Sequence, residues 1–576
     1  MNQKLENILN VSLDATEDEL RKADSLSTGY NWRDNTWEII VKYSGSLESI
    51  RNRYNVYIKE LLNYYAIIVA DKATIELISQ EDVIDYVEKP KSLYYQIERT
   101  KTAACVGSVR ADGNILSGKG VIVGVIDTGI DIFDNAFRNS DGTTRILNIY
   151  DQTTGEKYDK QSIDEYIRLN EDLSGGTFSY DNAPGVDNIM HGTDVSYIAA
   201  GSLGVAYEAD IIAVKMGYSI NNQFPRTTSL MDAIDYVIRK AIEYRKPVAV
   251  NISYGCNYGA HNGNTLLESF IDDISKSYRC VICVGSGNEA DKAIHFGGII
   301  NTGQVQTAYL SVGEYQSAMD IQIWKNYWDT IDVMLINPRG EQIGIITEGK
   351  INRYETYNTE IITLLGEPSP YNIYQEIYIN LIPKTDYILS GIWQIVLMAG
   401  NIRAGEYNIW LPSSQALGYA TAFNNPTADG TITIPATARN CIAVGAYNAY
   451  TNSYAAFSGR GFDNSIRNVN AGVKPDITAP GVDISIARQR GNDITYRNVT
   501  GTSYAVPVVT GAAALLMQWG IVMGNDRFMY GEKLKAALID GSKPVGLAGI
   551  TGNDNHPDPR TGWGAVCLMN TLNKIL

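Results

Sequence analysis

Histidine is scarce in this chain, because only His191, His261, His295 and His556 occur among 576 residues. Metal centres built from several imidazoles need clustered histidines, so such centres are not expected, and we predict no metal and no cofactor. Any chemistry that depends on a histidine side chain also has very few candidates here.

Positive charge is also in short supply, since 48 Lys and Arg stand against 64 Asp and Glu, a formal net charge of −16. This balance argues against nucleic acid or an anionic membrane as the main partner. We find no apolar run approaching about 18 residues, so no membrane span is expected. Residues 1–6 lack the basic and apolar regions of a signal peptide, and we therefore expect a soluble chain made in the cytoplasm.

Six cysteines in a chain of this length do not form a disulfide framework. Cys280 and Cys283 form a CxxC pair, but they lie within an apolar run typical of a buried strand. No second pair or nearby His pair completes a zinc site, so we interpret both as core residues.

The length of the chain suggests two to four domains. An apolar fraction of 44% with only 19% charged residues excludes a disordered chain. The pattern of residues 1–97 predicts a small α+β unit, with a strand at 64–70, a helix at 72–81 and a strand at 83–87. Pro90 and the polar stretch that follows it indicate a boundary.

From residue 118 onward, continuous apolar strands alternate with helices, which is typical of a parallel sheet covered on both faces. The expected strands lie at 121–126, 211–216, 248–252, 280–285 and 441–445, and the expected helices at 230–244 and 503–519. Residues 298–428 interrupt this alternation with many short strands, which predicts an inserted β-sandwich. We therefore expect a doubly wound α/β domain in two parts, 98–297 and 429–576, around that insert.

Three short motifs place chemically useful side chains on these elements. Asp127 ends a buried strand, where catalytic groups of open α/β sheets lie. His191, followed by Gly and Thr, opens one helix, and Ser503, preceded by Gly and Thr, opens another. The order Asp, His, Ser along the chain is one in which serine protease triads occur.

Each residue taken alone has a structural interpretation. Asp127 could cap a strand, His191 could be structural, and Ser503 could be a helix N-cap. Asp127-Thr128-Gly129 also matches the aspartic proteases, but these need two carboxylates that share a proton, and no second Asp-Thr-Gly or Asp-Ser-Gly occurs here. The joint occurrence of the three residues in this order favours the serine protease interpretation.

With these motifs in order, the chain resembles the subtilisin-like serine proteases, peptidase family S8. The matching stretches are residues 118–131, 191–201, 204–215, 251–255, 287–289, 435–437, 474–481 and 501–511. The resemblance implies that Asp127, His191 and Ser503 form the triad. It also implies that Asn288, which could otherwise be a turn residue after a strand, donates to an oxyanion hole together with the Ser503 backbone N–H.

The same resemblance implies where a peptide substrate lies. The edge that pairs with extended substrate would be formed by Ser253, Tyr254 and Gly255. The primary specificity pocket would be lined by Gly285, Ser286 and Gly287, whose small size suggests a roomy pocket.

The long insert and the absence of a recognisable signal peptide resemble the Csp proteases of clostridial spores. These carry a jelly-roll insert, retain their prodomain and activate a cortex-lytic hydrolase during germination. The likeness implies a propeptide at 1–97 that is cut near Gln96, with residues 91–97 in the cleft. It also implies a cortex-lytic zymogen as protein substrate, a monomer, and a place in the cortex or coat layers of the spore.

The chain departs from the family pattern at two positions. Asp194 stands where a second His is usual, and Tyr504, in place of Met, could narrow access to the site. Some Csp members have lost triad residues, so a pseudoprotease that binds germination signals is the alternative function. The insert would either stabilise the catalytic domain, replacing the calcium sites common in subtilisins, or dock the substrate.

Overall fold

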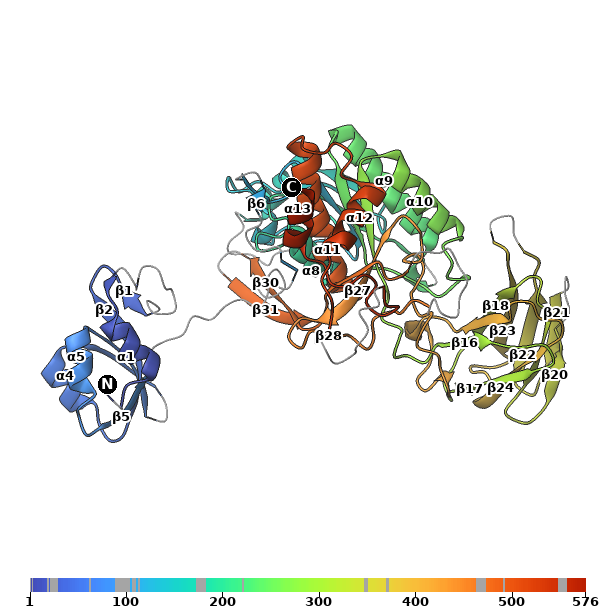
Figure 1. Cartoon of the computed structure of the whole chain (residues 1–576), viewed down its shortest axis with the longest axis horizontal. Coiled ribbons are helices and arrows are strands. Elements are labelled where there is room, and N and C mark those ends of the chain that lie inside the picture. Colours follow the sequence, from blue (N-terminus) through green and yellow to red (C-terminus); the bar gives the residue numbers. More distant parts are fainter. Residues whose placement is uncertain are drawn as a thin grey trace. The chain divides into compact units, whose positions relative to one another are not determined.

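The computed structural model describes the whole chain except residues 1, 3, 18–19, 21–28, 62–63, 89–103, 106–109, 112–113, 172–182, 220–221, 347–350, 369–371, 463–472, 491–492 and 547–556. The chain forms two compact units, Met1–Tyr95 and Gln96–Leu576 (Figure 1). Each is described by itself.

The first unit is an antiparallel sheet with the strand order β1-β2-β4-β3, in which β5 also pairs with β2. Its strands are β1 (Tyr30–Asn31), β2 (Thr36–Tyr43), β3 (Tyr57–Leu61), β4 (Tyr65–Ala70) and β5 (Ile84–Glu88), and its helices are α1 (Asn7–Asp14), α4 (Glu48–Tyr54) and α5 (Lys72–Ile78). Alternate residues of β2 are buried, which gives the sheet one face toward the core. The predicted α+β unit is confirmed.

The second unit is built on a sheet of nine strands. Seven are parallel, in the order β9-β11-β8-β14-β15-β27-β29, and antiparallel β10 and β28 flank them. The parallel strands are β8 (Ile122–Asp127), β9 (Ile146–Asp151), β11 (Asp210–Lys215), β14 (Val248–Ile252), β15 (Cys280–Gly285), β27 (Ile442–Asn448) and β29 (Ile477–Pro480); β10 spans Glu156–Asp159 and β28 spans Ser453–Tyr454. Strands β8, β14 and β15 are buried on both faces, which explains their continuous apolar sequences.

Helices cover both faces of this sheet (Figure 1). Helices α9 (Thr227–Tyr244) and α10 (Leu266–Ser277) pack on one face, and α8 (His191–Ala200) and α11 (Thr502–Met517) pack on the other, where α12 (Gly531–Asp540) and α13 (Leu568–Ile575) join the same core. The stretch Thr502–Val522, which contains α11 and the π-turn η4 (Gln518–Val522), is long and apolar enough to cross a membrane. Because 83% of it is buried in the protein, it is the central core helix of this layer.

Smaller elements surround the sheet. They are α7 (Lys160–Glu171), the 3-10 helix η1 (Asn135–Phe137), and the hairpins β6–β7 (Arg110–Ala111, Asn114–Ile115), β12–β13 (Tyr218–Ser219, Asn222–Pro225) and β30–β31 (Ile484–Arg490, Asp493–Val499). The hairpin β30–β31 directly precedes helix α11 and lies near the candidate site.

The insert consists of two antiparallel sheets that share one apolar core, as the sequence predicts. One sheet contains β16 (His295–Ile299), β25 (Glu406–Trp410), β18 (Met319–Asn326), β23 (Tyr374–Pro383), β22 (Thr359–Leu365) and β21 (Ile351–Glu355). The other contains β20 (Gln342–Ile345), β19 (Ile331–Ile336), β24 (Gly391–Ala399), β17 (Val305–Val312) and β26 (Ala422–Phe423); a 3-10 turn, η3 (Ser414–Ala416), lies between β25 and β26.

The insert is joined to the α/β domain through an aromatic stack. Trp410 of β25 lies between His261 and His295, at ring centroid distances of 4.2 and 4.9 Å. Both histidines are buried, with 4% and 1% exposed surface, and their ring nitrogens contact backbone or amide oxygens. These two histidines therefore hold the junction, while His556 lies outside the described residues.

The cysteines fall into two groups. Cys280 and Cys283 are buried in β15, as the sequence suggests, and burial raises the pKa of each thiol to about 12. Cys105 and Cys567 form a disulfide that the sequence analysis did not anticipate. The pairing could not be deduced because the two residues are separated by 462 positions, and cysteine spacing does not fix connectivity.

Candidate active site

The carboxyl end of β8 brings Asp127 against the imidazole of His191. The distance from Nδ1 of His191 to Oδ1 of Asp127 is 2.6 Å, and the same oxygen accepts the backbone N–H of Thr128 at 2.8 Å. Asp127 is buried with 1% of its side chain exposed, whereas 25% of the His191 side chain is exposed. One ring nitrogen is thus held by a buried acid while the ring keeps access to solvent.

Two glycines allow the Asp127 and His191 motifs to cross at close range. A Cβ on Gly192 would lie 2.3 Å from the carbonyl oxygen of Gly129, and one on Gly129 would lie 2.4 Å from that of Gly185. Gly129 also has a φ of +133°, which L side chains rarely adopt. The glycine in each motif is therefore required by the packing of the two backbones.

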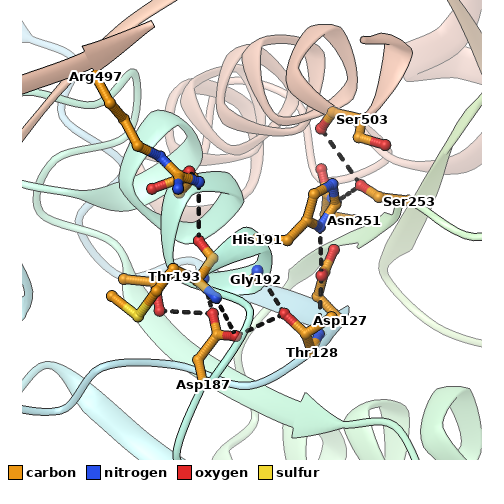
Figure 2. Close-up of polar contacts among 12 residues, drawn as sticks. Asp127, Thr128, Asp187, His191, Gly192, Thr193, Asn251, Ser253, Arg497 and Ser503 are labelled. Carbon is orange, nitrogen blue, oxygen red and sulfur yellow. Dashed lines mark hydrogen bonds and ion pairs between the residues drawn. The ribbon is translucent and has the colours of Figure 1, made fainter. Parts of the chain in front are cut away.

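Asp187 organises the start of helix α8 and was missed by the sequence analysis. Its Oδ1 accepts from the Thr128 hydroxyl and the Met190 N–H, and its Oδ2 accepts from the N–H and hydroxyl of Thr193, at 2.7–2.8 Å. The Thr128 hydroxyl in turn accepts the Gly192 N–H at 2.9 Å. Figure 2 shows this network beneath His191. An aspartate just before a helix start is the one sequence signal that could have revealed it.

The surroundings of His191 shift its pKa in opposite directions. Burial is the largest influence and lowers the pKa, but the charge and hydrogen bond of Asp127, with the charge of Asp187, outweigh it. The pKa of His191 therefore lies above its ordinary value of 6.5, although the positive charge of Arg497 lowers it somewhat. The imidazole is poised to accept a proton near neutral pH.

Ser503 and Asn288 meet at the N-terminus of helix α11. Oδ1 of Asn288 accepts the backbone N–H of Thr502 at 3.0 Å and its hydroxyl at 3.1 Å. Because Oδ1 is used in this way, the Nδ2 group is the donor that remains, and it lies near Gly501, where a Cβ would be 3.6 Å from it. An amide donor beside the positive end of a helix suits a developing oxyanion.

Of the other residues predicted to contact substrate, Ser253 lies beside the start of α11. Asn251 Nδ2 donates to the Ser253 hydroxyl at 3.0 Å, and that hydroxyl contacts the Ser503 carbonyl oxygen at 3.4 Å (Figure 2). Tyr254 is half-buried and Gly255 is exposed, both just beyond β14. Ser253 therefore contacts the start of α11 directly, and Asn251, which the sequence analysis did not single out, holds its hydroxyl and also accepts from Thr510 further along α11.

Gly285, the last residue of β15, and the two residues after it are packed more closely than a roomy pocket would suggest. A Cβ on Gly287 would lie 2.5 Å from the Thr433 side chain, and Gly285 faces Thr502 and Val506 of α11. Ser286 is fully buried, and its hydroxyl contacts that of Ser458 at 3.3 Å. The side chain of Ser286 therefore faces the protein interior.

Two further features affect how the site can react. The ring of Tyr504 lies 5.2 Å from that of His191, and Tyr504 is only 9% exposed. Within the described residues, the Ser503 hydroxyl makes no hydrogen bond to His191, and such bonds are often long before substrate binds.

The predicted cleavage position, Gln96, and the segment 91–97 lie outside the described residues. In that same described part of the chain, no three or more His, Cys, Asp or Glu residues are arranged to hold a metal ion.

Comparisons with known proteins give two family matches. A model described as the subtilase family matches residues 118–372 and 390–564, and one described as the Csp protease B prodomain matches residues 3–91. Among solved structures, the chain is similar to the CspB protease of Clostridium perfringens, with 34% identity and a TM-score of 0.75. That match covers 83% of this chain and 97% of that one.

Two curated proteins are similar over shorter stretches. One is the subtilase-type proteinase RRT12 of Saccharomyces cerevisiae, 32% identical over 128 residues, which are 22% of this chain and 23% of that protein. The other is the subtilisin-like protease 10 of Arthroderma otae, 34% identical over 118 residues, which are 20% of this chain and 26% of that protein. The chain therefore spans about a quarter of the length of these curated relatives.

Proposed function

Because the chain belongs to the subtilase family of serine proteases and carries a Csp-type prodomain, we propose that it is an active endopeptidase with Asp127, His191 and Ser503 as its triad. The observation that carries this proposal is the 2.6 Å contact between the buried Asp127 carboxylate and His191, at the same end of the sheet as Ser503. A histidine held in this way has a fixed tautomer and can act as a base toward a nearby hydroxyl.

In the proposed reaction His191 accepts the proton of the Ser503 hydroxyl as its oxygen attacks the peptide carbonyl. Asp127 stabilises the imidazolium that forms, and His191 then donates the proton to the departing amine. Asn288 Nδ2 and the Ser503 N–H stabilise the oxyanion. Loss of one such donor typically costs about 3 kcal/mol of transition-state stabilisation.

We propose two protein substrates. The first is the chain itself, cut between prodomain and catalytic part near Gln96. The second is a cortex-lytic hydrolase zymogen cleaved during spore germination, with the protease located in the spore. The support for both is the likeness to the CspB protease of Clostridium perfringens over 97% of that chain and the match of residues 3–91 to its type of prodomain.

The test is reactivity of Ser503 toward a fluorophosphonate probe, combined with intact-mass analysis of the purified chain. We expect the wild-type protein to be labelled at Ser503 and to be cut between residues 85 and 110. Ser503→Ala should abolish both labelling and the cut, because the proposed nucleophile is then missing. The matched control is Ser277→Ala, which removes an exposed serine hydroxyl at the end of α10 and should leave labelling and processing unchanged.

Two results would contradict the proposal. Processing that persists in Ser503→Ala would show that Ser503 is not the nucleophile. A processed wild-type protein that takes up no probe would favour the pseudoprotease alternative, in which the same fold binds germination signals.

A further inference from the structure

Asp194 is a buried charge on the first turn of helix α8, three residues after His191. None of its side chain is exposed. A buried carboxylate is stable only when it is paired, and two arginines pair with it. Arg488 donates from Nε to Oδ1 at 2.9 Å and contacts the same oxygen through Nη2, while Arg497 pairs with Oδ2. Both arginines come from the hairpin β30–β31.

The same two arginines also reach the carbonyl oxygen of Met190. Nη2 of Arg488 lies 2.9 Å from it and Nη2 of Arg497 lies 3.4 Å from it. Met190 is the residue directly before His191 and has a left-handed φ of +66°. Figure 2 shows Arg497 extending from its strand toward the start of helix α8. The hairpin therefore contacts α8 on both sides of His191.

The hairpin is held firmly enough to act as a support. Its strands are paired along their whole length, from Ile484–Val499 to Arg490–Asp493. Alternate residues of β30 share one face, and on that face Ile484 and Ile486 are buried in the main core. Arg488 is the next residue on this face of β30, and Arg497 is paired with Ile486 across the hairpin. Both arginines therefore belong to the face of the hairpin that packs against the core.

The hairpin is also continuous with the helix that carries Ser503. Strand β31 ends at Val499, four residues before Ser503. The base of the hairpin is closed by two hydrogen bonds, from Gly501 N–H to the Gly481 carbonyl at 2.9 Å and from Asp483 N–H to the Thr500 hydroxyl at 3.0 Å. The hairpin β30–β31 and the start of helix α11 are thus one continuous segment. This segment carries Ser503 and also contacts the start of α8.

We propose that Arg488 and Arg497 are positioning residues, which hold His191 in place relative to Ser503 through Asp194 and the Met190 carbonyl. This inference rests on the triad proposed above. It adds that the two arginines keep helix α8, which carries His191, in a fixed position relative to helix α11, which carries Ser503. The reacting groups lie on different helices, and a small misplacement of one against the other lowers the rate steeply.

The charges around His191 give this role a measurable signature. Its ring is faced by Asp127 from β8, Asp187 from the preceding loop, Tyr504 from α11 and Arg497 from β31. Asp127 and Asp187 raise the pKa of His191, whereas Arg497 lowers it. Removing the Arg497 charge should therefore raise the pKa of His191 further.

The experiment compares wild type with Arg497→Gln, Arg497→Lys and Arg488→Gln, by steady-state cleavage of a peptide over pH 5–9. Active-site titration with the fluorophosphonate probe corrects each preparation for its folded, reactive fraction. We expect kcat to fall about tenfold or more for the Gln variants while KM changes little, because positioning acts on the transition state. The midpoint of the acid limb should move to higher pH in Arg497→Gln and return toward wild type in Arg497→Lys.

The matched control is Arg353→Gln, which removes an exposed arginine from another hairpin, where it pairs with Glu360 at 3.1 Å. It should leave kcat and the pH profile unchanged. If Arg488→Gln fails to fold, Arg497→Gln decides alone, since 41% of that side chain is exposed.

Unchanged kcat and acid midpoint in Arg497→Gln per titrated site would overturn the proposal. So would a loss of titratable sites with normal kcat in those that remain, because that pattern indicates stability alone. Absence of probe labelling in the wild-type protein would instead refute the proposed function, so the two failures are distinguishable.

Discussion

The ionisation of one residue, His191, should set the acid limit of activity. In the proposed reaction its imidazole must be neutral to accept the Ser503 proton, and its pKa lies above 6.5 because the charges of Asp127 and Asp187 outweigh the effect of burial. Activity should therefore be lost as the pH falls through a midpoint above 6.5. A profile of kcat/KM against pH, at constant ionic strength, measures this midpoint directly.

Asp127→Asn should change both the rate and the midpoint. Without the carboxylate, burial dominates and the pKa of His191 falls, so the acid limb moves to lower pH. The rate should drop by roughly 10³- to 10⁴-fold, as for other triads that lose this acid. Asp235→Asn, a remote surface change on α9, is the control. A midpoint that stays in place in Asp127→Asn would show that another group limits activity at low pH.

At the scale of single residues, the sequence predicts a site residue when the positions next to it in the chain are also restricted to particular residue types. Asp127 and His191 are each followed within two residues by a glycine or threonine that the crossing of two backbones requires, so their motifs are short and strict. Arg488 and Arg497 carry no such signal. Their partner Asp194 is 294 residues away from Arg488, and only the fold brings the charges together.

At the scale of elements, the insert contacts the α/β domain beside Asn288, the proposed oxyanion donor, and in the segment after β14. Glu289, next to Asn288, accepts the backbone N–H and the hydroxyl of Ser414 at 3.0 and 3.2 Å. The Gly259 N–H donates to Gln322 at 2.8 Å, and Tyr258 contacts Asp320 at 3.3 Å. These bonds favour the interpretation that the insert stabilises the catalytic domain.

Deleting residues 300–425 and closing the gap with a short Gly/Ser linker should therefore lower the melting temperature. We expect a decrease of about 5 °C or more, because the buried side chains of His261 and His295 lose their contacts with Trp410 and Glu289 loses its hydrogen bonds to Ser414. Thermal unfolding followed by circular dichroism gives the value. Tyr309→Ser, on the solvent side of β17, should leave the melting temperature unchanged. Normal stability of the deletion, with loss of zymogen cleavage only, would favour substrate docking instead.

The elements themselves were predictable to different degrees. Strands β8, β14 and β15 are apolar on both faces, and their continuous runs stand out in the sequence. The hairpin β30–β31 was missed, because its inward face mixes isoleucine with arginine and only α8 explains why charged side chains point inward.

At the scale of the molecule, the disulfide between Cys105 and Cys567 joins the beginning of the catalytic unit to its last helix. Beside it, the Leu568 N–H donates to the Ala104 carbonyl at 3.1 Å. Cross-links that close long loops restrict the unfolded chain most. The disulfide should therefore contribute more to the stability of the catalytic unit than the few non-covalent contacts around it do.

Cys105→Ser should destabilise the protein by about 2–4 kcal/mol, the range typical of native disulfides. The measurement is urea unfolding of the wild-type and variant proteins without reductant. Cys256→Ser, which removes an unpaired cysteine, is the control and should unfold near the wild-type midpoint. Equal midpoints for the two variants, or mass spectra that show free thiols at both positions, would contradict the expected stabilisation.

With that bond closed, the chain from Cys105 to Cys567 is a covalent ring, and these two residues, each near one end of the catalytic unit, have a Cα–Cα distance of 4.7 Å. A polypeptide whose ends are neighbours can be opened elsewhere without loss of architecture. A circular permutant that joins the ends by a peptide linker, and begins instead in the turn at Asn337–Gly340 of the insert, would keep every strand of the main sheet. In such a molecule the prodomain would no longer precede the enzyme, and the need for it during folding could be measured apart from its place in the chain.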